Sequence, residues 1–564
     1  MTVQRTLTND QKSQQAQSTK AHEMAAQQRD IGIGEFFSRN RHLLGFDNKK
    51  KGLLTTVKEA VDNSLDACEE ASILPEISVD LIEMGQDRMR IVIEDNGPGI
   101  VKDQIGNIFA KLLYGSKFHR LKQSRGQQGI GISAAVMYGQ LTTGRAARVK
   151  TRISPDYPAH FYKLKIDTQK NKPSIEESKD VDWDKEHGTR IEIDLEATYQ
   201  GGQQSVDEYL RETAITNPHA TFIYTNPKAE QIIFPRAVDM LPHLPKEIKP
   251  HPYGVELGVM MDLLNATSAK TLQSFLTTEF SRVSSTAAKQ ICESAALLPD
   301  TKPKQMTRGA VEQLMKGINN TKLMGPPTDC LAPINAEHLE KGMRKEINAE
   351  FFSSTTRSPA VYRGNPFVIE VGMAYGGELK SDGAIKIMRY ANRVPLLYQQ
   401  GACAVTKSVT SNTWRSYGLN QSKGNIPTGP MVLAVHIASV WVPFTSESKE
   451  AVANYPEIIK EIKLGIQECG RKLSRYVAKK KKIQDESKKR GYIKKYIPHV
   501  SNALKSILEL KEADAEEVKE NLAVVLEDTR GKLEDMSFDP SKNTEYDEEF
   551  ARIGRGEESE DDEE

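Results

Sequence analysis

Hydrophobic and polar positions follow a helical period between residues 51 and 70 of this chain. At about 100° per residue, Glu59, Asn63 and Asp66 fall within an arc of roughly 60°. Apolar residues occupy the opposite side of the same helix: Leu53, Leu54, Val57, Ala60, Val61 and Leu65. The pattern predicts a helix that buries an apolar stripe and presents a carboxylate, an amide and a second carboxylate in a row. Such a polar row by itself is typical of a helix face that simply meets water.

Alternation with a period of two predicts strands after this helix. Met89, Ile91 and Ile93 alternate with Arg90, Val92 and Glu94. Gly85-Gln86-Asp87 separates this segment from another alternating one and is typical of a hairpin. The strands expected in this half of the chain lie near 76–84, 88–94, 145–153, 158–167 and 189–195, and a second helix is expected at 133–140.

The second half of the chain changes pattern twice. Prolines crowd residues 235–252, and the apolar spacing from about 253 to 325 is helical. Beyond Pro326-Pro327, alternation predicts strands at 366–372, 384–390 and 431–440, and a long helix is expected from Pro456. Both ends of the chain have the composition of disordered segments: residues 1–25 are rich in Gln, Ser and Thr, and residues 557–564 contain seven acids and one serine.

Composition and charge narrow the interpretation only slightly. A chain of 564 residues is long enough for several domains, each with its own core. Lys plus Arg and Asp plus Glu number 77 each, so net charge does not indicate a nucleic-acid partner. No apolar run reaches about 18 residues and no apolar signal core begins the chain, so we expect no membrane span and a cytoplasmic location. Five scattered cysteines without a Cys-x-x-Cys pair disfavour a zinc site or a disulfide framework.

Two glycine-rich loops carry the candidate chemistry. Asp95-Asn96-Gly97-Pro98-Gly99 ends a predicted strand, and its glycines let a ligand approach the main chain. The segment Gly126–Ser133 opens onto a helix N-terminus, where free N–H groups and the helix dipole suit phosphate. It is not a Walker A loop, because no Gly-Lys-[Ser/Thr] follows, and no strand precedes it as a dinucleotide-binding loop requires. A third segment, Gly188-Thr189, enters an alternating strand.

In this order and spacing, the Glu59–Asp66 row, the two glycine loops and Gly188-Thr189 resemble the motifs of the GHKL ATPase family. That family contains DNA gyrase, the Hsp90 chaperones, histidine kinases and MutL. Three further segments narrow the resemblance to the B subunits of the type IIB enzymes, the topoisomerase VI family: Glu35–Asn48, Leu113–His119 and Asn392–Tyr398. The resemblance extends from about residue 30 to about residue 505.

The resemblance implies an α+β multidomain fold. A GHKL (Bergerat) α/β sandwich ATPase domain would be followed by a helix-two-turn-helix domain, a transducer similar to domain 2 of ribosomal protein S5, and a C-terminal helical extension. The expected divisions are a disordered N-terminal arm at 1–25, the ATPase domain at 26–240, the helix-two-turn-helix domain at 250–328, the transducer at 329–478, a basic helical region docking the partner subunit at 479–540, and an acidic disordered tail at 541–564.

The resemblance also implies an ATP site with Mg²⁺. Glu59 would activate water, Asn63 would ligate Mg²⁺, and Asp95, supported by Thr189, would accept a hydrogen bond from the adenine amine. Lys449 matches the transducer lysine that reaches the γ-phosphate, although an ordinary surface lysine is the alternative. The implied nucleotide-contacting residues are Asn63, Asp95, Gly97, Gly99, Ser116, Lys117, Gly126, Gln127, Gln128, Gly129, Ile130, Gly131, Ile132, Ser133, Thr189 and Lys449.

The function implied is that of an ATP-gated clamp. Two copies would dimerise on ATP, with the N-terminal arm as a strap, and pass one double-stranded DNA segment through a break made by an A subunit in an A2B2 heterotetramer. This would relax supercoils and decatenate DNA. A MutL-like ATPase and a histidine kinase are the alternatives, but His22 and His42 lie too near the start for a kinase's phospho-accepting hairpin. DNA contact and a spacer role stay open for residues 253–325. For the basic run 479–495, a solvated face, DNA contact and subunit docking stay open.

Overall fold

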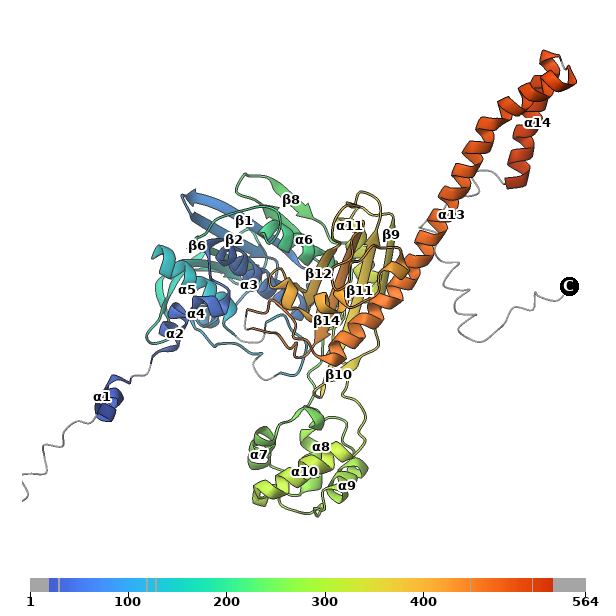
Figure 1. The fold of residues 1–564 in the computed structure, drawn as a ribbon. Helices are drawn as coiled ribbons and strands as arrows, with labels where there is room; N and C mark the ends of the chain where they lie inside the picture. The colour runs from blue at the N-terminus through green and yellow to red at the C-terminus, as the bar shows by residue number, and fades with distance from the viewer. Residues whose placement is uncertain are drawn as a thin grey trace, which may run out of the picture.

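A computed structural model describes residues 20–28, 31–117, 120–126, 129–446, 448–509 and 511–530. The predictions made for Gln127, Gln128, most of the N-terminal arm and the acidic tail lie outside these residues. Within them, three bodies follow one another along the chain, each around its own apolar cluster, and a long helix projects from the third (Figure 1). All five cysteines are buried and free.

The first body is built on a mixed sheet whose described strands run in the order β5-β4-β3-β6-β2-β1-β7-β8. Its strands are β1 (Glu76–Gly85), β2 (Arg88–Asp95), β3 (Ala147–Arg152), β4 (Ala159–Asp167), β5 (Lys172–Val181), β6 (Gly188–Glu196), β7 (Thr221–Thr225) and β8 (Gln231–Phe234). Its helices are α2 (Ile33–Arg39), α3 (Lys49–Glu70), α4 (Lys102–Ala110), α5 (Gly131–Thr143) and α6 (Val206–Thr216), and α1 (Lys20–Gln27) lies apart from it (Figure 1).

Helix α3 has the two faces that the sequence predicts. It begins where the side chain of Asn48 accepts a hydrogen bond from the amide of Lys51, an N-cap. The six apolar residues predicted to form its stripe are all buried, none more than 5% exposed. The predicted hairpin is also present: Gly85 pairs with Arg88, and Asp87 in the turn has φ 56°.

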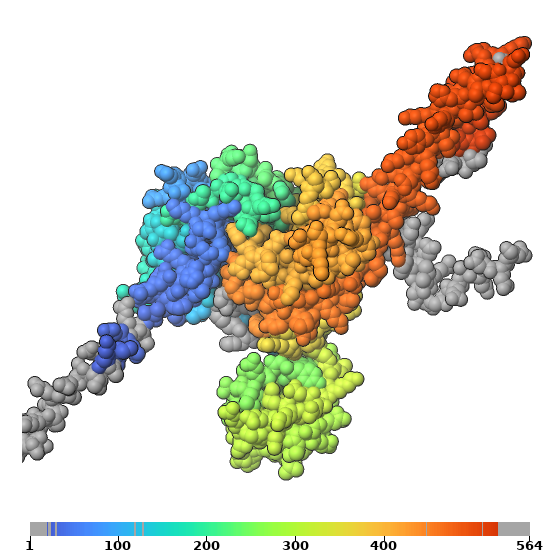
Figure 2. All heavy atoms as spheres, in the orientation of Figure 1, coloured from blue at the N-terminus to red at the C-terminus, as the bar shows by residue number. Residues whose placement is uncertain are grey.

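The second body contains four described helices: α7 (Leu257–Ala266), α8 (Leu272–Glu279), α9 (Ser285–Ser294) and α10 (Arg308–Asn320). Hydroxyl side chains cap three of them, because Thr271, Ser284 and Thr307 each accept a hydrogen bond from a first-turn amide. The space-filling view shows this body as a separate lobe below the rest of the molecule (Figure 2). The predicted helical pattern of this region is therefore confirmed.

The third body is built on a second sheet in the order β10-β11-β14-β12-β13, with β9 also paired to β11. Its strands are β9 (Phe351–Thr356), β10 (Ala360–Tyr362), β11 (Asn365–Tyr375), β12 (Lys386–Ala391), β13 (Val394–Pro395) and β14 (Met431–Ser439). Helix α11 (Ala336–Glu346) joins one apolar cluster of this sheet, whereas α12 (Ala404–Thr410) and α13 (Pro456–Leu508) join the other. Ile215 of α6 belongs to the α11 cluster, so the first and third bodies share buried apolar contacts.

Helix α13 leaves the third body and carries α14 (Glu512–Arg530) at its far end (Figure 1). It passes without interruption through position 478, the predicted end of the transducer. The domain boundaries stay a prediction. None of the described helices is both long enough and apolar enough to span a membrane.

Candidate nucleotide-binding site

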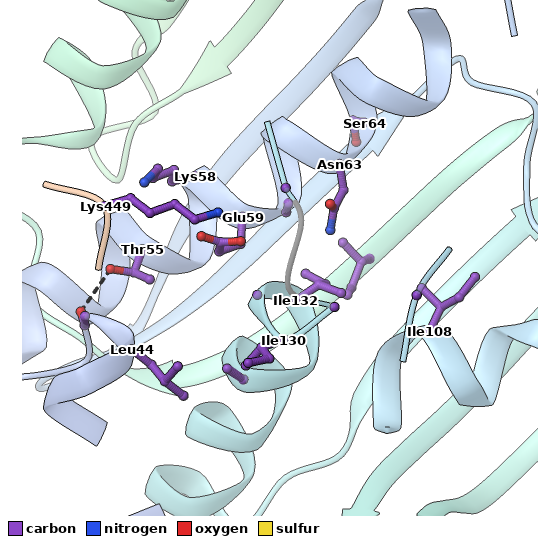
Figure 3. Close-up of a pocket in the computed structure, with 18 of the residues that line it drawn as sticks. Leu44, Thr55, Lys58, Glu59, Asn63, Ser64, Ile108, Ile130, Ile132 and Lys449 are labelled. Carbon is purple, nitrogen blue, oxygen red and sulfur yellow. Dashed lines mark hydrogen bonds between the residues drawn. The ribbon is translucent and has the colours of Figure 1, made fainter. Parts of the chain in front are cut away.

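A cavity of about 370 Å³ lies where the first and third bodies meet. The Asp95–Ile100 loop lines it, together with α3, the start of α5 and the segment around Lys449. The last three can be followed by their labelled residues in Figure 3. Its volume is within the range of small-molecule and cofactor sites, about 300–1,000 Å³. An apolar wall that includes Ile108, Ile132 and Ile191 faces polar groups from α3, a combination typical of a site that holds a flat base next to charged groups.

Helix α3 supplies two of its three aligned polar residues to the cavity. Glu59 and Asn63, one turn apart, both line it (Figure 3). Asp66 does not: it is 8% exposed and its carboxylate pairs with Arg125 at 2.7 Å and with Lys117 at 2.8 Å. The row expected from helical geometry is therefore real, but basic residues from the following loops cover its last member.

Asp95 forms the buried polar floor of the cavity. Its Oδ2 accepts a hydrogen bond from the hydroxyl of Ser64 at 2.6 Å, and its Oδ1 accepts from the amides of Gly97 at 3.0 Å and Thr189 at 3.2 Å. Burial raises the pKa of the Asp95 carboxyl above its usual range, although these three hydrogen bonds act in the opposite direction. Two carboxylate oxygens offer about four acceptor positions, so one further donor can be accommodated.

The glycine-rich loop meets Glu59 at the start of α5. Gly126, Gly129, Ile130, Gly131 and Ile132 line the cavity. A Cβ on Gly131 would lie 1.8 Å from Oε2 of Glu59, so any side chain there would have to displace the Glu59 carboxylate from its place against the loop. The first amides of α5 have no partner within the helix and its N-terminus is positive, which favours an anion at this end of the cavity.

The segment after α4 closes another side of the cavity. Ser116 and Lys117 both line it, as expected. The ammonium of Lys117 is held by Asp66 and lies 3.3 Å from Glu70, and although burial opposes the charge, these two carboxylates raise its pKa. Lys117 therefore enters the site as a charged group that is already paired.

Lys449 reaches the cavity from the third body, 323 positions beyond Gly126. It extends over α3 toward Glu59 in the close-up view (Figure 3). Its Nζ donates to the carbonyl of Arg125 at 3.5 Å, and its backbone has φ 52°, a conformation uncommon for a residue with a side chain. The next residue, Glu450, pairs with Lys51 of α3 at 2.5 Å, which docks this loop on the first body.

Most of the residues expected at the site come together in this cavity. Thr189 and Gly99 line it, whereas Gly97 and Ser133 stand behind it: the amide of Gly97 supports Asp95, and the hydroxyl of Ser133 donates to the carbonyl of Ile130. Sequence reasoning missed Ser64, although it directly follows Asn63. It also assigned no role to five further lining residues, of which the last two lie in segments that carry the family resemblance: Lys51, Thr55, Lys58, Tyr114 and Tyr398.

The donor set fits a magnesium ion bound through one protein ligand. Among the described residues, no group of three or more His, Cys, Asp or Glu side chains could hold a metal. The amide of Asn63 is exposed and enters the cavity (Figure 3). Mg²⁺ commonly keeps waters and substrate phosphates and takes only one or two protein oxygens, so this arrangement is compatible with it.

Comparison with known proteins gives matches over both parts of the cavity. The family described as histidine kinase-, DNA gyrase B-, and HSP90-like ATPase matches residues 48–199, and the family described as topoisomerase VI B subunit, transducer, matches residues 326–489. The B subunit of type 2 DNA topoisomerase 6 from Methanococcoides burtonii is 52% identical over 490 residues, covering 87% of this chain and 79% of that protein.

Two further relatives carry the same description. The protein of Methanosarcina acetivorans is 49% identical over 490 residues, covering 87% of this chain and 79% of its own. The protein of Archaeoglobus fulgidus is 46% identical over 487 residues, covering 86% of this chain and 81% of its own.

Proposed function

Because this chain belongs to the family of type 2 DNA topoisomerase 6 B subunits, we propose that it hydrolyses ATP in the cavity described above and uses the cycle to gate DNA passage. The predicted α+β multidomain fold, with a GHKL ATPase domain and a transducer, is confirmed by the two family matches and the two sheets. A MutL-like protein or a histidine kinase is not supported, since the matched transducer and the relatives at 46–52% identity belong to topoisomerase 6.

We assign each residue a role in hydrolysis from its position in the cavity. In our proposal, Asp95 accepts a hydrogen bond from the adenine amine and the loop before α5 holds the phosphates. Asn63 supplies a ligand to Mg²⁺, which when bound neutralises phosphate charge. Glu59, one turn before Asn63 and against Gly131, orients and deprotonates the attacking water.

The observation that carries this proposal is the entry of Lys449 into the cavity from the third body. A lysine is a compact point charge, so it can detect a single phosphate group. Loss of that group on hydrolysis would remove one of the contacts that hold the third body against the first, and the two could then move relative to each other.

The partners we propose follow the relatives' description. A second copy of this chain would join on ATP binding, and the topoisomerase A subunit would complete an A2B2 assembly that acts on double-stranded DNA. The exposed basic part of α13, residues 479–495, is our candidate for the end that docks the A subunit.

ATP-dependent relaxation of supercoiled plasmid by the reconstituted two-subunit enzyme tests this function. Lys449→Met should bind ATP through the Asp95 and Gly131 side of the cavity, yet lose most hydrolysis and all relaxation. Lys423→Met is the matched control, because Lys423 is exposed in the same body and does not line the cavity. Wild-type relaxation by Lys449→Met would overturn the role of Lys449, and an inactive reconstituted wild type would overturn the function.

A further inference from the structure

A buried turn of the third body holds unusual residues in an unusual conformation. Strands β12 and β13 pair Ala391 with Val394, so Asn392 and Arg393 form a two-residue turn. Both have positive φ, 47° and 69°, and both are buried, 8% and 5% exposed. Such turns favour Asn-Gly, and a side chain at the second position is strained. Strain of this kind persists only where the surroundings fix it, and it is frequent at functional positions.

The side chain of Asn392 joins the third body to the first. Its Nδ2 donates to the carbonyl of Ser439 at 2.9 Å and to the carbonyl of Ser124 at 3.1 Å, and its Oδ1 accepts from the amide of Ser439 at 2.9 Å. Ser439 ends β14, whereas Ser124 stands two residues before the phosphate loop begins at Gly126. One amide therefore bridges the transducer sheet and the approach to the phosphate loop.

The residues on either side of Ser124 are held by the third body in the same way. Gln123 donates from its amide to the carbonyl of Cys330 at 2.9 Å, and its side chain exchanges hydrogen bonds with the backbone of Ala332 at 2.7 and 3.2 Å. The carbonyl of Arg125 accepts from Lys449. We call Gln123, Ser124 and Arg125 the anchor segment, because three consecutive residues each contact the third body.

The turn is braced from within the third body. Arg393 donates from Nη2 to the carbonyls of Ala332 and Pro333, the same loop that holds Gln123. Its amide donates to Nε2 of His436 at 2.9 Å, while Nδ1 of His436 bonds to Glu370 at 2.8 Å. Burial lowers the pKa of His436, which favours the neutral ring whose Nε2 can accept that bond. The Asn392–Arg393 turn and the loop around Ala332 are therefore joined by hydrogen bonds into one unit, and the anchor segment binds to it.

The anchor segment is also fixed to the ATPase helix. The guanidinium of Arg125 is buried and pairs with Asp66 and Glu69 of α3, each at 2.7 Å. Its Nη2 also donates to the side-chain oxygen of Asn217. The amide nitrogen of Asn217 in turn donates to the carbonyl of Arg393 at 3.4 Å. The backbone of the anchor segment and the side chain of Gln123 thus contact the third body, whereas the side chain of Arg125 contacts α3.

We propose that Asn392 is a positioning residue for the phosphate loop: it holds the anchor segment on the transducer independently of Lys449. Lys449 contacts the anchor segment at 3.5 Å and has the γ-phosphate as its proposed partner, so its contact is exchangeable. The bonds of Asn392 and Gln123 involve no group that ATP would take. These bonds stay in place while the contact of Lys449 with the anchor segment is made and broken. This inference rests on the proposed ATPase function.

Asn392→Gly is the first variant of the test. Glycine suits the positive φ of this turn, so the backbone is retained while the bond to Ser124 is lost, together with the two side-chain bonds to Ser439 at the end of β14. In the full chain, hydrogen exchange at residues 121–126 should become faster, with exchange in the interior of β14 unchanged. The kcat for ATP should fall about tenfold with KM within threefold, since displacement of catalytic groups by about 1 Å can cost up to roughly 10²-fold in rate.

A second variant and a matched control complete the test. Asn392→Asp keeps the acceptor for the Ser439 amide but has no N–H for the carbonyls of Ser124 and Ser439, so it should reproduce the faster exchange at 121–126 even if the glycine variant does not fold. Asp87→Gly is the control, because Asp87 is also a turn residue with positive φ but lies outside the cavity. It should leave kcat and exchange at 121–126 unchanged.

The outcomes separate the inference from the function on which it rests. Unchanged exchange at 121–126 in folded Asn392 variants would overturn the inference. An equal increase of exchange in β14 would also overturn it, since Asn392 would then only stabilise the transducer. A wild-type chain that does not hydrolyse ATP would overturn the proposed function, while the exchange measurement would still decide the role of Asn392.

Discussion

Replacing Asp95 with asparagine should weaken adenine nucleotide binding without unfolding the protein. Oδ1 of the asparagine can still accept from the amides of Gly97 and Thr189, as Asp95 does at 3.0 and 3.2 Å. The new NH₂ group would stand where Oδ2 now accepts from Ser64, and the serine hydroxyl can rotate to accept instead. Because burial disfavours the charge of Asp95, its removal relieves a desolvation cost that partly compensates any lost bond strength.

The loss in affinity follows from the bond to the base. Asparagine presents a donor to the adenine amine, which is itself a donor, so the contact is lost. A hydrogen bond to a charged group contributes about 1.5–3 kcal/mol. At about 1.4 kcal/mol per tenfold, the dissociation constant for a non-hydrolysable ATP analogue should rise roughly 10- to 150-fold.

Calorimetric titration measures this change in affinity. A second nucleotide, which lacks the amine, tests whether the loss comes from that bond. A hypoxanthine triphosphate carries a carbonyl oxygen where adenine carries the amine, so Asp95→Asn should bind it as well as or better than the wild type does. Asp194→Asn is the control, because Asp194 is a buried aspartate of neighbouring β6 that does not line the cavity. Equal affinity of wild type and Asp95→Asn for the ATP analogue would refute the assignment of Asp95 to the base.

Three other outcomes are expected. Glu59→Ala should bind the ATP analogue normally while phosphate release falls by about 10²–10⁴-fold, the usual contribution of a general base; turnover near the wild-type rate would exclude Glu59. Light scattering should find a monomer without nucleotide and a dimer with the analogue, and one mass under both conditions would contradict gating. Burial raises the pKa of Asp62 to about 7, so the fold favours its protonated form and loses stability as pH rises from about 4 through 7. Asp62→Asn should remove that loss, at most roughly 4 kcal/mol at 1.36 kcal/mol per pKa unit; the thermal midpoint between pH 5 and pH 8 measures it, and an equal fall in both proteins would argue against titration of Asp62.

The sequence predicts helices and strands best where one face of the element is buried and the other is exposed. Helix α3 and strand β1 each pair an apolar face with a more polar one, so period alone locates them to within one or two residues. Strand β5 was not predicted, because nearly all of its residues are exposed at the edge of the sheet and no alternation marks it. Pairing with β4, a contact between segments, creates this strand.

The same difference between local and long-range contacts separates the site residues that the sequence predicts from those that it misses. Asp95, Asn63 and the glycine loop have motifs because their roles need fixed residue types at fixed spacing. Their neighbours do not: Arg125 could not be singled out, since its importance comes from Asp66, Glu69 and Asn217, which only the fold brings to it. The Asn392–Arg393 turn lay in a segment that the family resemblance pointed to, but its contact with Ser124 joins residues 268 positions apart.

Helix α3 connects these contacts mechanically. Near its start, Lys51 pairs with Glu450, the neighbour of Lys449. In its middle, Glu59 lines the cavity at the proposed phosphate end. Near its end, Asp66 pairs with Arg125 of the anchor segment. Lys51 and Asp66 are separated by about 22 Å along a helix that rises 1.5 Å per residue. Its apolar stripe is packed in the core along this whole length, which favours movement of the helix as a unit. A change at the phosphates therefore reaches the third body at two distant points at once, and this favours rotation of that body over a local shift of a loop.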